Sequence, residues 1–133
     1  MDVVVERATS STEELRALFD AALATLVHKR GGRALLVSLG TEATSLDTYL
    51  GDESLWIARD GALVGFGVCR GPLIVGIYVT PTLRRHGVAR ALVNEMIRVS
   101  APIDAYALPG DRAMKSLYES CGWKARLLTM RAE

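Results

Sequence analysis

The residues most able to do chemistry gather in one basic loop between a strand-like and a helix-like segment. Ile77–Val79 is apolar and largely β-branched, and residues 86–99 place apolar side chains at three- and four-residue steps, as an amphipathic helix does. The first turn of a helix leaves backbone N–H groups without partners and has a partial positive charge. Such a turn is a ready site for a phosphate anion. The loop therefore predicts a binding site for a pyrophosphate group.

The side chains of this loop suit the same chemistry. Gly87 and Ala89 have little or no side chain, so an anion can approach the main chain closely. Positive or polar side chains surround them: Arg84, Arg85, His86 and Arg90. The loop has neither the G-K-[ST] of a Walker loop nor the G-x-G-x-x-G of a dinucleotide-binding fold. An ordinary helix start with solvated arginines is the alternative interpretation.

A second group of residues follows about 25 positions later. The segment reads Asp111-x-x-Met114-x-x-x-Tyr118-x-x-x-Gly122-Trp123. Tyr118 has a phenol that can exchange a proton, and Asp111 stands where a helix would begin. Spacing alone places Tyr118 on the apolar stripe of a helix, together with Met114, Leu117 and Cys121. On that evidence alone the core explains the side chain better than catalysis does.

The elements that must position these residues alternate between strand and helix patterns. The capping-box spacing of Ser11 and Glu14 predicts the start of the first helix, which Gly31-Gly32 ends, and Asp60-Gly61 predicts a hairpin turn. The predicted strands are Asp2–Ala8, Leu55–Arg59, Leu63–Arg70, Leu73–Val79, Ile103–Leu108 and Lys124–Met130, and the predicted helices cover residues 11–30, a short stretch near 46–50, 86–99 and Asp111–Cys121. The order β-α-α-β-β-β-α-β-α-β predicts a mixed α/β fold in one domain, 1–133.

Composition excludes several classes of protein. The 133 residues are 50% apolar and 23% charged, with a net charge of +1, so a core can form and a general nucleic-acid or membrane-surface binder is disfavoured. The longest apolar stretch, Pro72–Val79, is too short to span a bilayer, and the N-terminus lacks a secretion signal, which predicts a cytoplasmic protein. Two cysteines and two histidines argue against a disulfide framework and against a metal site.

Both chemical segments resemble one family. Arg84-x-x-Gly87-x-Ala89, preceded by Val79-x-Pro81, resembles the R/Q-x-x-G-x-G/A motif of the GCN5-related N-acetyltransferases (GNAT), and the Asp111–Trp123 segment is similar to their N-x-x-A-x-x-x-Y-x-x-x-G-F pattern. One helix and one strand separate the two motifs, as in that family. The resemblance implies a mostly antiparallel sheet flanked by helices and an acetyl-CoA-dependent N-acetyltransferase. The alternatives are a non-catalytic acyl-CoA-binding or scaffold module and a binder of nucleotide phosphates.

The resemblance also implies roles for individual residues. It assigns the pantetheine arm of acetyl-CoA to the strand Ile77, Tyr78 and Val79, which faces a gap before the strand Ile103–Leu108. It assigns the pyrophosphate, through backbone N–H groups, to the loop and helix start: Arg84, Arg85, His86, Gly87, Val88, Ala89 and Arg90. Asp111 stands in the place of an asparagine near the cofactor. Tyr118 matches the general acid that protonates the departing thiolate.

The sequence departs from the family pattern at several points. No glutamate occupies the two central strands, so we expect deprotonation of the amine through ordered water, with Asp104 as a weaker candidate. Cys69 and Cys121 are interpreted as buried apolar residues, which implies direct transfer, and His28 as a surface residue. Only one strand follows Trp123, which predicts an open acceptor side and a homodimer. Residues 12–54 should shape the acceptor pocket, and the acceptor stays open between peptides, lysine, polyamines, aminoglycosides and small metabolites. The acids of that range, Glu42, Asp47, Asp52 and Glu53, could recruit a cationic amine or form a solvated face.

Overall fold

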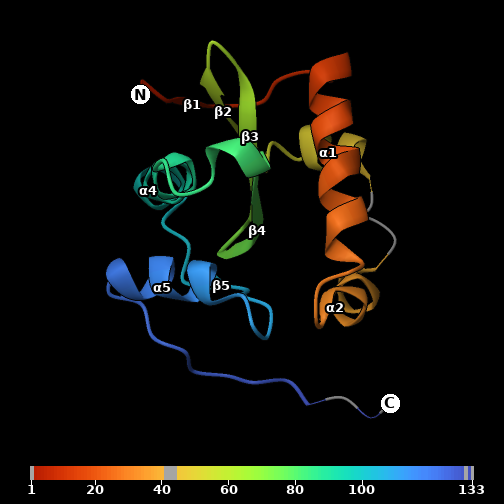
Figure 1. Ribbon diagram of the computed structural model, residues 1–133, viewed down its shortest axis with the longest axis vertical. Helices are drawn as coiled ribbons and strands as arrows, with labels where there is room; N and C mark the ends of the chain where they lie inside the picture. Colours follow the sequence, from red (N-terminus) through yellow and green to blue (C-terminus); the bar gives the residue numbers. More distant parts are fainter. Residues whose placement is uncertain (1, 41–44, 131, 133) are drawn as a thin grey trace.

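The computed structural model describes residues 2–40, 45–130 and 132, and its strands form one sheet between helices (Figure 1). The elements in chain order are β1 (Val4–Arg7), α1 (Glu13–Leu26), α2 (Gly32–Leu39), α3 (Leu46–Gly51), β2 (Leu55–Asp60), β3 (Ala62–Arg70), β4 (Leu73–Val79), the 3-10 turn η2 (Pro81–Leu83), α4 (Val88–Ser100), β5 (Asp104–Ala105) and α5 (Arg112–Ser120). The predicted mixed α/β architecture is confirmed.

The strands lie in the order β1-β2-β3-β4-β5. The first four pair antiparallel, and only β5 runs parallel to its neighbour β4. Figure 1 shows α1 and α2 on one side of the sheet and α4 on the other, with α5 beneath α4. The parallel pair follows from the α4 crossover, because a strand that returns after a helix enters the sheet in the same direction. The sheet is therefore mostly antiparallel and flanked by helices, as expected.

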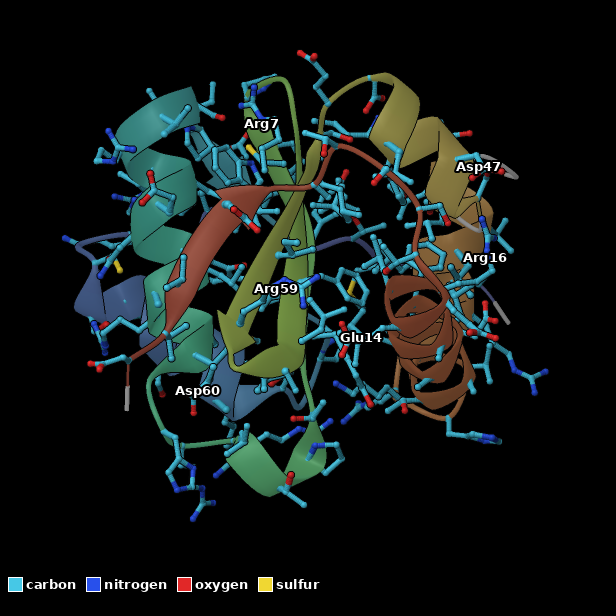
Figure 2. All side chains as sticks on the ribbon, turned by 90° about the horizontal axis from the view of Figure 1, so that it is seen from above. Arg7, Glu14, Arg16, Asp47, Arg59 and Asp60 are labelled. Carbon is cyan, nitrogen blue, oxygen red and sulfur yellow. The ribbon has the colours of Figure 1, made fainter. Side chains whose placement is uncertain are left out.

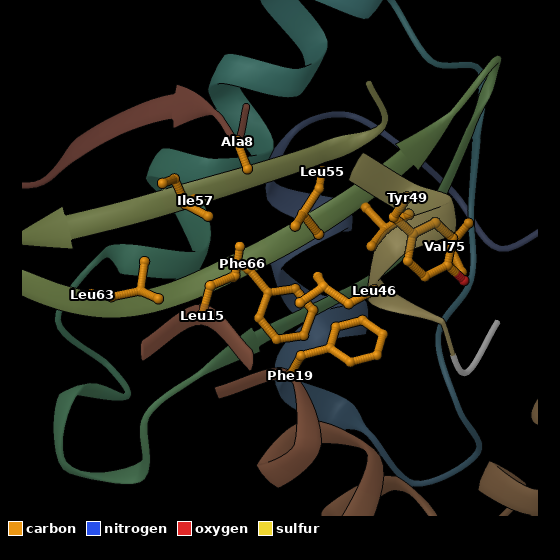
Figure 3. Close-up of a cluster of buried hydrophobic side chains, with 11 residues drawn as sticks. Ala8, Leu15, Phe19, Leu46, Tyr49, Leu55, Ile57, Leu63, Phe66 and Val75 are labelled. Atoms are coloured by element: carbon orange, nitrogen blue, oxygen red, sulfur yellow. The ribbon is translucent and has the colours of Figure 1, made fainter. Parts of the chain in front are cut away.

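Each face of the sheet buries its own apolar cluster. The cluster under α1 and α3 contains Leu15, Phe19, Leu46, Tyr49, Leu55, Ile57, Leu63, Phe66, Val68 and Val75 (Figure 3). The cluster under α4 and α5 contains Trp56, Ala58, Val64, Cys69, Ile74, Val79, Val88, Leu92, Val93, Met96 and Tyr118. Consecutive residues of β2 alternate between the two clusters, because side chains alternate across a strand. This alternation explains why the central strands read as almost continuous apolar runs.

The start of the first helix differs from the predicted capping box. Thr12, not Ser11, is the N-cap, and its hydroxyl accepts a hydrogen bond from Leu15 N at 3.1 Å. The Glu14 side chain does not bond to the backbone of the N-cap residue. Its carboxylate instead accepts a hydrogen bond from Arg59 Nη1 at 3.0 Å, and both residues are labelled in Figure 2. Tertiary pairing with β2 therefore replaces the local reciprocal bond that the spacing suggested.

The Gly31-Gly32 pair does not end the first helix. α1 stops at Leu26, and Gly32 is the first residue of α2, a helix that the sequence patterns left undefined. Gly31 adopts a positive φ of 81° as the N-cap of α2. A Cβ at Gly32 would lie 1.8 Å from the carbonyl oxygen of Leu26. The two glycines therefore allow α2 to turn back tightly against the end of α1.

The last two predicted strands are the largest corrections. Of Ile103–Leu108 only Asp104–Ala105 pairs in the sheet, and Lys124–Met130 forms no strand. Leu127 and Met130 are 90% and 82% exposed, so neither is held against a partner surface. A ladder needs a matching edge of similar length, and the two residues of β5 do not offer one. Within the described part of the chain no helix is long and apolar enough to cross a membrane.

Candidate functional site

The strand β4 changes its neighbours halfway along its length. Val68 pairs with Gly76 and Cys69 with Ile74, so Val75 is an extra residue that forms a β-bulge. On the other side β5 pairs only with Leu73 and Ile74, and the amide of Tyr106 donates to Ile74 O at 3.0 Å. The second half of β4, residues 76–79, therefore has no strand on that side. An unpaired strand edge can pair with an extended ligand.

The basic loop lies at the end of this free edge. Arg85 has a φ of +67° and Gly87 a φ of +86°, both in the left-handed region that side chains disfavour. Gly87 is the N-cap of α4 and supplies no side chain to its first turn. A Cβ at Gly87 would meet no atom within 4 Å, so the space beside the backbone is open. The first-turn amides of α4 are therefore left without a capping side chain, as predicted for an anion site.

The loop side chains divide into two groups. Arg84 turns back toward β4: its Nε donates to Val79 O at 3.2 Å, and its guanidinium lies over the ring of Tyr78 at 5.6 Å. His86 Nδ1 is 2.9 Å from Arg84 O. Arg85 and Arg90 are exposed, as Arg84 is, but their side chains form no hydrogen bond or ion pair with the described residues. Arg84 therefore holds the loop on the strand, whereas the other two arginines are free to approach a ligand.

Tyr118 is buried beneath the sheet on the α4 side. It is 6% exposed, and its hydroxyl group is buried without a hydrogen-bond partner among the described residues. Its ring stacks on that of Trp123, with centroids 5.7 Å apart and planes 15° apart. Burial, followed by the nearby charge of Asp111, raises the pKa of the Tyr118 phenol well above its usual value. The group therefore keeps its proton throughout the neutral range and can act as a donor.

Asp111 connects the start of α5 to the turn that follows α1. Its carboxylate accepts a hydrogen bond from Met114 N at 3.2 Å, which caps α5, and lies 3.8 Å from Lys29 Nζ. A Cβ at Gly31 would lie 2.9 Å from Pro109, so the turn after α1 rests against the segment before α5. The negative charge that replaces the family's asparagine is thus offset by Lys29.

An apolar pocket of about 120 Å³ lies on the α1 and α2 side of the free edge. Leucines of the two helices line it, together with the aromatic rings of Phe19, Tyr49, Phe66 and Tyr78. Its floor is β4 from Val75 to Tyr78, and a Cβ at Gly76 would meet nothing within 4 Å. The pocket and the basic loop therefore meet along the same half-strand, where Tyr78 lines the pocket and contacts Arg84 of the loop.

A second, polar hollow of about 500 Å³ lies at the other end of β3 and β4. Its walls include Arg7, whose guanidinium lies 4.6 Å from the Trp56 ring centre, and the ion pair between Arg70 and Asp52 at 2.8 Å. Asp52 and Glu53, which could recruit a cationic amine, and Cys69 line it, but none of the residues predicted to bind the cofactor or to act as the acid does. We therefore place the candidate site at the free edge of β4.

The remaining predicted residues lie away from this edge. Asp104 and His28 are exposed and do not line the pocket. Cys69 is buried, and burial raises the pKa of its thiol, which does not favour a nucleophile. Asp47 and Asp52 lie outside the apolar pocket and pair with arginines, and Glu42 lies outside the described residues.

Sequence reasoning did not identify the pocket-lining residues of α2 or the role of Lys29. The region was expected, because residues 12–54 were predicted to shape the acceptor pocket, but the apolar stripe of α1 was interpreted as core. The α2 residues Leu35, Leu36 and Leu39 complete the wall, and all three line the pocket. A pocket wall and a core face have the same apolar pattern, so a pattern alone cannot separate them.

Comparisons with known proteins identify the fold and the family. A model of the acetyltransferase (GNAT) domain matches residues 51–125, and the chain therefore belongs to the GNAT acetyltransferase family. No curated protein matches the sequence.

Solved structures with the same fold cover almost the whole chain. A GNAT-family acetyltransferase from Bacillus cereus is 16% identical with a TM-score of 0.72, covering 100% of this chain and 90% of that one. A ribosomal-protein-alanine N-acetyltransferase from Brucella melitensis is 19% identical with a TM-score of 0.62, covering 99% and 98%. The aminoglycoside N-acetyltransferase AAC(6')-Iy in complex with CoA is 17% identical with a TM-score of 0.59, covering 98% and 95%.

Proposed function

We propose that the protein is an acetyl-CoA-dependent N-acetyltransferase that moves an acetyl group directly to a primary amine. The observation that supports this most is the buried, unpartnered hydroxyl of Tyr118, which belongs to the same cluster as Ile74 and Val79 of β4. An unsatisfied buried hydroxyl is costly, so it is retained where a ligand supplies the missing partner. A thiolate leaving from the free edge of β4 would be such a partner.

The residues present suit the co-substrate. The diphosphate would be held by backbone N–H groups from Arg85 to Arg90, with the left-handed Arg85 and Gly87 shaping the concavity. The pantetheine arm would lie along the free edge, Gly76–Val79, as an added strand. Asp111 would stand near the arm with its charge offset by Lys29. The thioester, when bound, supplies the acetyl group.

In the reaction a C–N bond forms and a C–S bond breaks. Tyr118 donates its phenolic proton to the sulfur, and the phenolate is reprotonated by water. A phenol with the usual pKa of 10.0 is already protonated at neutral pH, so Tyr118 acts as the acid and not as the base, although burial raises its pKa and makes it a weaker acid. The described pocket residues include no carboxylate, so the amine loses its proton to water. At equal binding, an α-amine that is partly neutral at pH 7 would therefore react faster than an alkylamine such as a lysine side chain.

Thiol release from acetyl-CoA in the presence of an amine panel tests this function. Tyr118→Phe should lower kcat at least tenfold, since general acids contribute about 10²–10⁴-fold, while the Kd for CoA changes less than about twofold. Tyr106→Phe is the matched control, because Tyr106 is 45% exposed and outside the cluster. Wild-type turnover in Tyr118→Phe would show that Tyr118 is not the acid.

A non-catalytic acyl-CoA-binding module is the second candidate. It is favoured by the lack of a carboxylate among the described pocket residues, because no side chain there can take the proton of the amine. Such a module would bind CoA with the same loop. It would release no thiol with any amine, whereas an enzyme releases thiol in proportion to the acceptor.

We also propose that the chain forms a homodimer. Leu127, Leu128 and Met130 are more than two-thirds exposed, Ile103 is 73% exposed, and one edge of β5 is unpaired. Exposed apolar side chains beside an open strand edge favour pairing with a second chain. Light scattering over a hundredfold range of concentration should give twice the monomer mass. A constant monomer mass would contradict the dimer.

A further inference from the structure

The apolar pocket opens onto the half-strand where the acetyl group would be transferred. Val75, Gly76 and Tyr78 belong both to β4 and to the pocket wall. The bulge at Val75 explains this arrangement, because an extra residue in a strand re-aims the side chains that follow it. A molecule in the pocket would therefore reach β4 from the side covered by α1 and α2. This is the side from which an acceptor would approach.

The wall of the pocket has the wrong chemistry for a polycation. Lys29 is the only charged residue among the described residues that line it, and its charge has the same sign as an ammonium group. Thr25 uses its hydroxyl within α1, where it donates to Ala21 O at 2.9 Å. Among the described acids of the region, Asp47 pairs with Arg16 on the surface (Figure 2). A polyamine or an aminoglycoside would bring several charges to a wall that offers them no counter-ion.

The size of the pocket limits the group that it can hold. A cavity of about 150 Å³ lined by leucine, isoleucine and phenylalanine takes up benzene, and this pocket is about 120 Å³. The leucines and the rings of Phe19 and Phe66 give a wall of the same type. A compact group of about four to six carbons, branched or aromatic, would therefore fill it.

We propose that the acceptor is a primary monoamine bearing one compact apolar group, which the pocket between α1, α2 and β4 binds. This inference rests on the proposed acetyltransferase function, because that function sets the side from which the amine approaches β4. The amine can be a free small molecule or the N-terminus of a peptide with an apolar first residue. The shared chemistry is one amine next to one apolar group.

A series of amines of increasing length provides the first measurement. Binding of ethylamine, propylamine, butylamine, isoamylamine and phenethylamine to the CoA-loaded protein would be followed by ligand-observed NMR. Each added methylene should tighten binding about threefold to fourfold, since its burial is worth about 0.8 kcal/mol, until the pocket is full. Spermidine and the aminoglycoside neamine should bind at least tenfold more weakly than phenethylamine. Peptides beginning with Leu or Phe, and the same peptides beginning with Lys, separate the two sources of the amine.

A pair of alanine substitutions in α1 tests the location. Ala22 lines the pocket, whereas Ala24 is exposed on the same helix. Ala22→Leu should weaken phenethylamine binding at least tenfold, and Ala24→Leu should change it less than about twofold. If Ala22→Leu fails to fold, Leu36→Ala serves instead: it enlarges the wall and should shift the preference toward a group that is one or two carbons larger.

Binding decides this inference, and thiol release decides the proposed function. Tight binding of phenethylamine that Ala22→Leu abolishes supports the inference, even if no amine gives thiol release and the enzymatic function fails. Thiol release with spermidine or neamine but not with apolar monoamines overturns the inference and leaves the acetyltransferase standing. Equal binding in the wild type and Ala22→Leu also overturns it.

Discussion

The two faces of the sheet are packed differently. On the α4 face Leu92, Val93 and Met96 have no exposed surface, and Gly65 lets α4 approach so closely that a Cβ there would lie 3.2 Å from Val88 Cγ1. On the α1 and α2 face a Cβ at Gly76 would meet nothing within 4 Å, and a pocket remains. One face therefore holds a loop in a strained shape, while the other keeps space for a ligand.

This difference suggests a division of labour between the faces. A backbone with positive φ at Arg85 and Gly87 persists only where the surroundings hold it, and the filled core beneath α4 provides that support. A pocket, in contrast, must lose some packing energy to remain open. Specificity for the acceptor can then change on one face without disturbing the anion loop on the other.

Truncation of buried side chains should show the largest difference in stability between the two faces of the sheet. Leu92→Ala should lower the free energy of unfolding by about 3 kcal/mol, because it leaves a cavity in a filled core. Leu36→Ala, in the pocket wall, should cost about 1 kcal/mol, since the cavity already exists there. Urea unfolding followed by tryptophan fluorescence measures both. Equal losses would contradict the difference in packing.

Gly87→Ala tests whether the loop depends on its left-handed turn. The side chain should strain the backbone by about 1 kcal/mol and weaken CoA binding about tenfold or more, because the anion site loses its shape. Gly61→Ala is the matched control, since Gly61 has a φ of 76°, has open space around its Cβ position, and lies in the β2–β3 hairpin. The Gly61→Ala variant should lose a similar amount of stability, but calorimetry should show that it binds CoA with the affinity of the wild type. A normal CoA affinity in Gly87→Ala would remove the loop from the site.

Tyr118→Phe should separate stability from activity. Deleting a buried hydroxyl without a partner should raise the free energy of unfolding at pH 7 by about 1 kcal/mol, although turnover falls. Urea titration at neutral pH measures the change. A loss of stability would mean that the hydroxyl has a structural partner in solution.

The same residue predicts a pH dependence. The phenol ionises near its usual pKa of 10.0 in the unfolded chain, while burial raises the pKa of Tyr118 in the folded state. Stability should therefore be unaffected below pH 10 and fall as the pH rises above it, by up to about 1.4 kcal/mol per pH unit. Tyr118→Phe should show a shallower fall between pH 9 and 11. Identical slopes would contradict a buried phenol.

Loss of the ion pair between Lys29 and Asp111 should have the smallest effect on stability and on CoA affinity. Lys29→Met removes a partly exposed pair with Asp111 and should change the free energy of unfolding by less than about 0.5 kcal/mol. Because Asp111 would then be left uncompensated near an anionic ligand, CoA affinity should fall about twofold, and high salt should abolish the difference. Lys115→Met on α5 is the control. A change larger than tenfold would assign Lys29 a direct role.

The sequence predicted the fold best where patterns were local and strong. The hairpin at Asp60-Gly61, the strand β4 and the helix after Gly87 all lie within a residue or two of their expected positions. Short motifs also singled out the basic loop at the end of β4 and Tyr118. The failures lie where tertiary pairing decides: the segment 124–130 has strand-like residues but no edge to pair with, and α2 depends on Gly32 fitting against Leu26. The pocket was invisible because only packing distinguishes it from core.

The single surplus residue in β4 has a consequence for how such a site can arise. Without the bulge, β4 would keep its register with β3 and could also pair with its other neighbour, β5, along its whole length. The free edge of β4 would then be closed. Val75 shifts the phase of everything after it by one residue. Insertion or deletion of one residue, and not exchange of one amino acid for another, would therefore change whether β4 can pair with β5 beyond Ile74.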